Sequence, residues 1–286
     1  MSALSTYTIL LGLAQDGGHP QAGCERECCA AAWADPSKGH RVAALGIADG
    51  AKRWLVDATP DFATQLRTLL HDGTTGELAG ILLTHAHIGH YTGLVDLGRE
   101  VMGAREVPVY AMPRMRSFLA ANGPWEMLER LHNIAVRPLE DGVAVRLSDA
   151  VTITPFAVPH RDEYSETVGF VVAGPKSKVL YLPDIDKWER WSTRIEDRIA
   201  QVDAAYVDGT FFSATEIPGR SMAEVPHPFV EESLARFASL PAGERDKIHF
   251  VHLNHTNPAL DPSSDAFRRV RAAGMNIAVE GEKVGL

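Results

Sequence analysis

Three histidines lie close together in the segment Thr84-His85-Ala86-His87-Ile88-Gly89-His90. The segment follows a short apolar run, Ile81 to Leu83, which is typical of a buried strand. Residues two apart in an extended chain point the same way, so His85 and His87 can bind one cation from the end of that strand. A turn at the intervening glycine can bring His90 alongside. The spacing favours a metal site, and the alternative is a solvated histidine-rich turn.

Further metal-binding side chains stand at the ends of predicted strands much later in the chain. They are His160, Asp184 and His252. Neutral imidazoles suit zinc, iron and manganese, while a hydrolytic site also needs a carboxylate and an open position for water. Taken singly, each has another interpretation: a surface turn residue, the N-cap of a following helix and a core histidine, respectively. Taken together, they describe one rim of a sheet structure.

The elements that must position these residues are short strands and helices. In the first half we predict strands at 7–13, 42–48, 53–57, 80–83 and 107–111, a helix over 60–70 and another beginning near residue 93. In the second half we predict strands at 151–158, 167–172, 179–182, 204–207 and 248–253, with helices at 188–200, 229–238 and 265–273. Two strand-rich halves, each with helices, predict two sheets packed face to face and covered outside. This is an α/β fold of the four-layer αββα sandwich type.

Length, composition and charge limit the class of protein. With 286 residues, 45% of them hydrophobic, the chain is expected to form a single globular domain over 1–286. Its net charge of -9 repels phosphate backbones and anionic lipids, so a small-molecule substrate is expected, with no nucleic-acid or membrane partner. The apolar run Ile9 to Ala14 is too short to cross a bilayer, which predicts a cytoplasmic protein. The oligomeric state stays open, a homodimer included.

Three cysteines are gathered within six positions near the start of the given sequence. They are Cys24, Cys28 and Cys29. An odd number packed into so few positions disfavours a disulfide framework, so a metal site or reduced thiols is the better interpretation.

The sequence resembles the metallo-β-lactamase fold superfamily. Its histidine segment is similar to the H-x-H-x-D-H signature, and Val56-Asp57-Ala58 is similar to the family's strand-end aspartate. Within the superfamily, the chain is similar to pyrroloquinoline quinone biosynthesis B-like proteins and to the cyclic phosphodiesterase of the carbon-phosphorus lyase pathway. The resemblance covers nearly the whole chain through the motifs Leu11-Gly12-Leu13-Ala14, Thr59-Pro60-Asp61-Phe62, Leu182-Pro183-Asp184, Asp208-Gly209-Thr210 and His252-Leu253-Asn254-His255-Thr256-Asn257-Pro258.

This resemblance implies a pair of metal sites. The implied ligands are His85, His87 and His160 for the first site, and His90, His252 and a bridging Asp184 for the second. Zinc is the expected ion, with manganese or iron as alternatives. The implied nucleophile is a bridging water, present as metal-bound hydroxide, which suits hydrolysis of a phosphodiester, ester or lactone. Asp57 and Asp61 are expected to orient ring N–H groups, with core or capping roles as the alternative.

One residue departs from the signature. Gly89 stands where the family places an aspartate that binds the second metal. The second site then keeps two imidazoles and a shared carboxylate, and its affinity should fall. We therefore expect a mononuclear or unequally filled centre.

The cysteine cluster has a counterpart in the same relatives, which hold structural zinc with a cysteine-rich turn and a histidine near the C-terminus. The matching histidine here is His255, three residues beyond His252. The spacing C-x3-C-C differs from the relatives' C-x-C-x2-C. The resemblance implies a structural zinc site, and reduced buried thiols or a redox role are the alternatives.

Two further features bear on function. His227 lies in the proline-bounded loop Val225-Pro226-His227-Pro228, where it could donate a proton to a leaving group or be an exposed loop histidine. Trp188 and Trp191 could line a substrate pocket or simply pack. We expect a metal-dependent hydrolase of the phosphodiesterase type. The alternatives are an iron-dependent oxidase or hydroxylase related to pyrroloquinoline quinone biosynthesis, and a catalytically silent metal-binding module.

Overall fold

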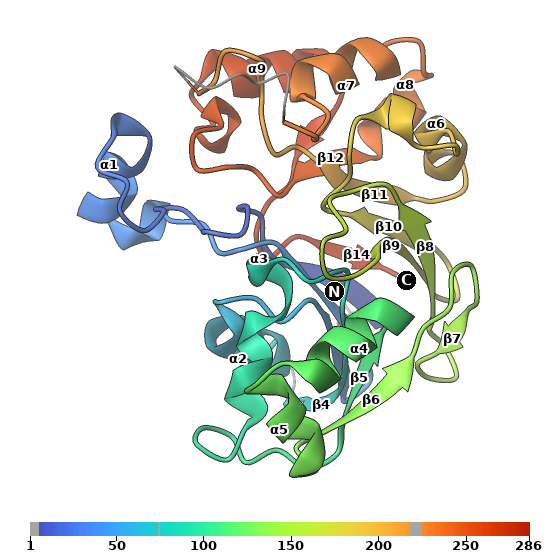
Figure 1. The fold of residues 1–286 in the computed structure, drawn as a ribbon. Helices are drawn as coiled ribbons and strands as arrows, with labels where there is room; N and C mark the ends of the chain where they lie inside the picture. The colour runs from blue at the N-terminus through green and yellow to red at the C-terminus, as the bar shows by residue number, and fades with distance from the viewer. Residues whose placement is uncertain (1–5, 74, 218–224) are drawn as a thin grey trace.

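The computed structural model describes residues 6–73, 75–217 and 225–286. Within these ranges, two seven-stranded sheets pack against each other, and helices cover their outer faces (Figure 1). The strand orders are β14-β1-β2-β3-β4-β5-β6 and β13-β12-β11-β10-β9-β8-β7. This arrangement confirms the predicted αββα sandwich. No helix in the described part of the chain is long and apolar enough to span a bilayer.

The strands of the first sheet are β1 (Thr6–Gly12), β2 (Ala44–Asp49), β3 (Lys52–Val56), β4 (Glu77–Leu82), β5 (Val107–Ala111), β6 (Ile134–Pro138) and β14 (Lys283–Gly285). Those of the second are β7 (Val145–Arg146), β8 (Thr152–Val158), β9 (Thr167–Ala173), β10 (Lys178–Leu182), β11 (Ala204–Asp208), β12 (Ile248–Val251) and β13 (Asn276–Ile277).

The α-helices are α1 (Glu27–Ala34), α2 (Phe62–Leu70), α3 (Ile88–Tyr91), α4 (Pro113–Ala121), α5 (Trp125–Arg130), α6 (Ile195–Ile199), α7 (Val230–Phe237), α8 (Ala242–Asp246) and α9 (Asp265–Ala272). Short 3-10 helices are η1 (Pro36–Lys38), η2 (Thr92–Leu97), η3 (Trp188–Arg190) and η5 (Pro258–Leu260). Figure 1 shows α1 on an arm that stands to the left of the two sheets.

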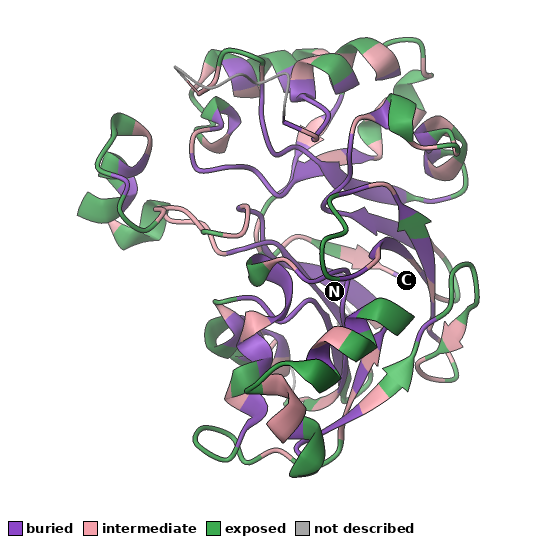
Figure 2. Cartoon of the chain, viewed as in Figure 1, coloured by how far each residue is buried: buried purple, intermediate pink, exposed green. Residues whose placement is uncertain are grey.

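The core has an inner layer between the sheets and a further layer beneath the helices. Successive side chains of a strand point to opposite faces. In β3, Trp54 therefore packs in the inner layer with Phe170 and Phe250 of the second sheet. Its neighbour Leu55 faces outward and packs in the same cluster as Phe62 of α2. Figure 2 shows the result, with the strands largely buried and the helices exposed on their outer sides.

Strand direction decides where the polar residues gather. Strands β3 and β4 are parallel, and β1 runs in the same direction because two antiparallel pairings separate it from β3. In the second sheet, β10, β11 and β12 are parallel, and β8 runs with them through two antiparallel pairings. Residues that follow the carboxyl ends of these strands therefore lie at one edge of their sheet.

The predicted helix 188–200 is interrupted. The structure has η3 and α6 there, with residues 191–194 outside any helix. Tertiary contacts fix the two tryptophans: Trp188 Nε1 donates to Ser233 Oγ at 2.9 Å, and Trp191 stacks on Phe156. Packing of these indoles overrides the helical spacing, and it supports the packing interpretation of the pair.

Candidate metal centre

The residues implied for a first metal site meet at the carboxyl edge of the sheets. His85 and His87 follow β4, His160 follows β8, and Asp184 follows β10. Their ligand atoms all lie within 4.8 Å of one another. Nε2 of His85 lies 3.3 Å from Oδ2 of Asp184, and Nε2 of His160 lies 3.2 Å from Oδ1 of the same carboxylate. The structure therefore brings together four side chains from three separate strand ends.

His90 and His252 lie on the other side of Asp184. Their Nε2 atoms are 4.0 and 3.9 Å from Oδ2 of Asp184, and both rings are fully buried. His252 adopts a left-handed backbone conformation with φ 64°, which is uncommon for residues other than glycine and often found at functional sites. Asp184 thus stands between two groups of imidazoles, as a bridging carboxylate would.

The second group also contains a carboxylate that was not predicted from the sequence, that of Asp16. Oδ1 of Asp16 lies 3.2 Å from Nε2 of His90 and 3.6 Å from Nε2 of His252. Asp16 follows β1, whose carboxyl end lies at the same edge. Asp16, His90 and His252 therefore form a group of possible ligands that includes a carboxylate beyond the shared Asp184.

The donor atoms fit a metal ion. Several of them are buried and have no hydrogen-bond partner among the described residues: Nε2 of His90, His160 and His252, and Oδ1 of Asp16 and Asp184. Burying such atoms without a partner costs free energy, so polar atoms left in this way require a specific reason. All of them belong to the two groups around Asp184. Imidazole nitrogens with carboxylate oxygens suit zinc, manganese or iron.

The opposite nitrogen of each buried ring has a partner that fixes its orientation. Nδ1 lies 3.0 Å from Thr84 Oγ1 in His85, 2.7 Å from Asp57 Oδ2 in His90, 3.2 Å from Asp186 Oδ1 in His160 and 3.0 Å from Thr210 Oγ1 in His252. Such contacts to the ring nitrogen away from a metal set the tautomer of the ligating imidazole. Asp57 makes the expected contact to a ring nitrogen, whereas the contacts of Thr84, Asp186 and Thr210 were not predicted.

The same arrangement occurs twice. Thr84 Oγ1 donates to Asp57 at 2.9 Å, which leaves its oxygen free to accept from Nδ1–H of His85. Thr210 Oγ1 donates to Asp208 at 2.8 Å and can accept from Nδ1–H of His252 in the same way. Each chain of hydrogen bonds leaves Nε2 without a proton, which is the form that binds a cation.

Asp61 does not orient a ring. Its Oδ2 accepts a hydrogen bond from the backbone N–H of Val42 at 2.8 Å, and no described histidine lies in hydrogen-bonding contact with it. Asp61 stands just before α2 and ties the start of that helix to the segment before β2. The alternative role in the core is therefore the one that the structure supports.

His227 is buried against two carboxylates rather than exposed in a loop. Its Nδ1 lies 2.8 Å from Oδ2 of Asp208 and 3.2 Å from Oδ1 of Asp184, and only 4% of the residue is exposed. Asp208 also accepts a hydrogen bond from the backbone N–H of Thr210 at 2.8 Å. His227 is therefore positioned beside Asp184 by a second, buried aspartate.

Burial and neighbouring charges set the protonation of the centre. Burial and the proximity of His90 lower the pKa of His85 well below its ordinary value. Burial opposes the charge on His160 too, but Asp184 prevails and raises the pKa of His160 to about 10. The carboxylate of Asp184 has its pKa held well below the ordinary value, against burial, by His160, His227 and His252. The carboxylate is ionised and ready to bind a cation.

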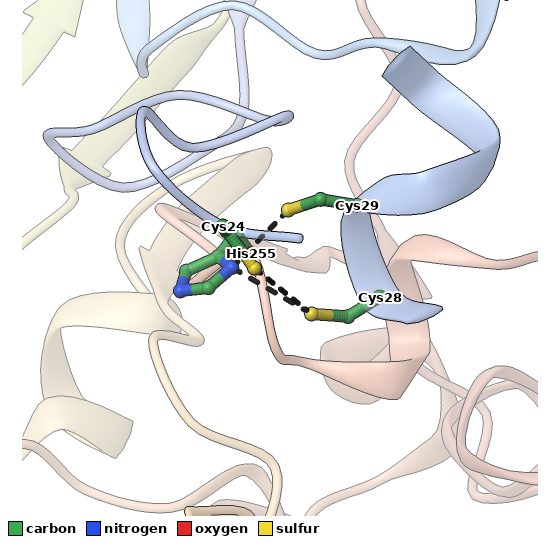
Figure 3. Close-up of side chains that lie close together, drawn as sticks. All are labelled: Cys24, Cys28, Cys29 and His255. Carbon is green, nitrogen blue, oxygen red and sulfur yellow. Dashed lines mark hydrogen bonds between the residues drawn. The ribbon is translucent and has the colours of Figure 1, made fainter. Parts of the chain in front are cut away.

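The cysteine cluster forms as the resemblance implied (Figure 3). Sγ of Cys24 lies 3.7 Å from Sγ of Cys28, and Nδ1 of His255 lies 3.7 Å from Sγ of Cys28 and 3.3 Å from Sγ of Cys29. The adjacent Cys28 and Cys29, at the start of α1, both point toward the ring (Figure 3). Three sulfurs and one nitrogen form a donor set typical of structural zinc.

Comparison with known proteins agrees with this geometry. The model of the beta-lactamase superfamily domain matches residues 52–252. The coenzyme PQQ synthesis protein B of Xanthomonas campestris pv. campestris (strain B100) is 26% identical over 97% of this chain and 99% of its own length.

Two solved structures share the fold. Zinc-bound PqqB from Methylobacterium extorquens has a TM-score of 0.83 and 23% identity, covering 98% of this chain and 100% of its own. A diphosphatase of the PhnP family has a TM-score of 0.69 and 21% identity, covering 98% of this chain and 96% of its own.

Proposed function

This chain belongs to the β-lactamase superfamily, and from that premise we propose that it is a metal-dependent hydrolase of a small phosphodiester, ester or lactone. One observation carries the proposal. A buried carboxylate, Asp184, lies between two groups of imidazoles. In these groups, Nε2 of His90, His160 and His252 has no hydrogen-bond partner among the described residues. Divalent cations held there would supply Lewis acidity and a water nucleophile at neutral pH, which is the chemistry of hydrolysis.

The side chains of this centre divide the work. His85, His87 and His160 would hold a cation on one side of Asp184, and His90 and His252 would hold one on the other. The orienting contacts of Asp57 and Asp208, direct or through a threonine hydroxyl, hold the rings in place before substrate arrives. Preorganised groups of this kind stabilise charge that develops in the transition state without reorganising.

His227 holds the proton that the leaving group needs. Burial opposes its charge, but Asp208 and Asp184 raise the pKa of His227 above its ordinary value. A protonated imidazole next to the centre is suited to general acid catalysis on a departing alkoxide. Asp208, which lies 2.8 Å from Nδ1, positions the ring and stabilises its charged form.

The cysteine cluster serves stability rather than catalysis. Its four donors resemble a closed structural zinc site, which contributes directly to folding. Zinc in PqqB from Methylobacterium extorquens supports zinc as the metal of this chain. The likeness to a diphosphatase of the PhnP family supports a phosphate-containing substrate. The net charge of -9 favours a small substrate over a nucleic acid.

Turnover of bis-p-nitrophenyl phosphate by the chain loaded with zinc, manganese or iron tests the proposal. We expect hydrolysis with at least one of these metals and its loss in His85→Ala, whose ring lies 3.3 Å from Asp184. The control variant is His132→Ala, because the side chain of His132 is 79% exposed and pairs with Glu106 instead.

The other outcomes separate the rival functions. Oxygen consumption by the iron-loaded chain, with no hydrolysis of phosphodiesters, esters or lactones, would contradict the proposal in favour of an oxidase or hydroxylase. Tight metal binding without either activity would instead indicate a silent binding module.

A further inference from the structure

We propose that Asp16 is a ligand of the second metal site and replaces the aspartate that the histidine signature lacks at Gly89. The inference rests on the proposed function, because it assumes that the centre binds metal. It concerns this chain's own departure from the signature. The carboxylate comes from a distant segment, after β1, rather than from within the motif after β4.

Three buried atoms of Asp16, His90 and His252 lie close together. Oδ1 of Asp16 and the Nε2 atoms of His90 and His252 are buried and have no hydrogen-bond partner among the described residues. Yet Oδ1 of Asp16 lies only 3.2 Å from Nε2 of His90 and 3.6 Å from Nε2 of His252. Atoms that approach so closely without hydrogen-bonding geometry are arranged around a common point. Oδ2 of Asp184, at 4.0 and 3.9 Å from the two nitrogens, completes the set.

Asp16 in its present position and a side chain at position 89 exclude each other. A Cβ atom added to Gly89 would lie 2.3 Å from Oδ1 of Asp16 and 2.6 Å from its Cα. Both distances are far inside van der Waals contact. An aspartate at position 89 would therefore occupy the space that Asp16 now fills. The glycine at position 89 is therefore what allows Asp16 to reach His90 and His252.

Backbone hydrogen bonds hold Asp16 next to His252. Leu253 N donates to Leu13 O at 2.8 Å, and Gln15 N donates to Leu253 O at 2.8 Å. Ala14 and Leu253 form a bridge between the extensions of β1 and β12. The segments that carry Asp16 and His252 are thus paired directly beside the two side chains. A metal ligand on such a rigid support loses little freedom when it binds.

The charge of Asp16 agrees with this role. Its carboxylate faces the two buried rings of this group directly, 3.2 Å from Nε2 of His90 and 3.6 Å from Nε2 of His252. The second group therefore offers an anionic oxygen of its own, two imidazoles and the shared Asp184. It is a complete site, in contrast to the mononuclear or unequally filled centre expected from Gly89.

Metal binding by the full chain tests the inference. Each variant is loaded with zinc, desalted and analysed for metal content, and its weakest site is then titrated against a chromophoric chelator. We expect Asp16→Asn to retain one equivalent fewer than the wild type. Its affinity for that equivalent should fall by more than the roughly 10–100-fold that follows loss of an orienting partner. Asp246→Asn is the control, because Asp246 is exposed in α8.

Gly89→Ala provides an independent variant that keeps every ligand. Its added methyl group should displace Asp16 and lower the same affinity by at least roughly tenfold, by analogy with the loss of an orienting partner. Gly243→Ala is the matched control, since nothing lies within 4 Å of a Cβ at that position. Metal-free melting temperatures of all variants show whether each one folds.

The outcomes distinguish the two proposals. Wild-type affinity and metal content in both Asp16→Asn and Gly89→Ala would overturn the role of Asp16 and leave the hydrolase intact. If the wild type instead retains no more zinc than a His85→Ala, His90→Ala double variant, the centre binds no metal and the proposed function itself is wrong.

Discussion

Asp208 and His227 form a buried pair in which Oδ2 of the aspartate lies 2.8 Å from Nδ1 of the imidazole. The other oxygen of Asp208 accepts from Thr210 Oγ1, which contacts Nδ1 of His252 at 3.0 Å. One carboxylate therefore positions both a metal-binding ring and the ring that we expect to protonate the leaving group. The two roles can be separated by experiment. Loss of a proton donor should depend on the leaving group of the substrate, whereas loss of a metal ligand should lower the metal content.

Removal of the proton donor should depend on the leaving group. We expect His227→Ala to lower kcat by about 10²–10⁴-fold for a diester with an alkyl leaving group, since general acid catalysis has that magnitude. The loss should be much smaller for p-nitrophenolate, which departs without a proton. Rates measured over a series of leaving groups check this, and an equal loss across the series would rule out the proton-donor role. Metal content should stay at the wild-type level.

Metal binding should release protons and strengthen as the pH rises. Against burial, Asp57 and Asp16 raise the pKa of His90 well above its ordinary value, and Asp184 raises that of His160 to about 10. Both rings are therefore protonated at neutral pH before binding, and a ligating imidazole must be neutral. Titration calorimetry in buffers of different ionisation enthalpy measures the release. Affinity that falls between pH 6 and pH 8 would contradict the assignment of these rings as ligands.

Asp57 should matter for metal affinity more than for the fold of its strand. It adopts a left-handed conformation with φ 68°, which asparagine tolerates well, so Asp57→Asn is a conservative test. The variant weakens the contacts to His90 and Thr84, and we expect zinc affinity to fall roughly 10–100-fold. Competition titration provides the measurement, with Asp246→Asn as control. Unchanged affinity would mean that the ring of His90 is held by other contacts.

The cysteine cluster should hold zinc more tightly than the centre. We expect one equivalent to remain after mild chelation has emptied the sites around Asp184, because a closed site of three thiolates and an imidazole resists exchange. His255→Ala and Cys29→Ser should lose this equivalent and melt at a lower temperature. If the chain melts at the same temperature after complete removal of zinc, the cluster consists of reduced thiols and has no structural metal.

The sequence was sufficient for the architecture and most of the centre. Two strand-rich halves, each with helices, predicted the sandwich, and the candidate ligands that follow β4, β8, β10 and β12 were found because each stands at a strand end. The helix predicted over 188–200 was wrong in its middle, where the contacts of Trp188 and Trp191 prevail. Such contacts join distant segments and leave no periodicity in the sequence.

Asp16 could not be found by spacing alone. It stands in a glycine-rich turn that contains no other ligand of the centre, and only the pairing of β1 with β2 and of β2 with β3 brings it to the same edge. The sequence gives only an indirect indication. Because the signature lacks one carboxylate at Gly89, a replacement is expected after another strand that runs parallel to β4. Asp61 was the opposite case, an acidic residue within a recognised motif whose contact is to backbone.

The segment that follows β12 has a consequence for how the protein acquires its metals. His252 and His255 stand only three residues apart, one in the candidate metal centre and the other in the cysteine cluster. A second connection also joins the centre to the cysteine cluster, because Asp16 and Cys24 both lie between β1 and α1. Ion uptake at the cysteines would fix both connections in advance, so we expect the two loadings to be cooperative, with the cysteine cluster filled first.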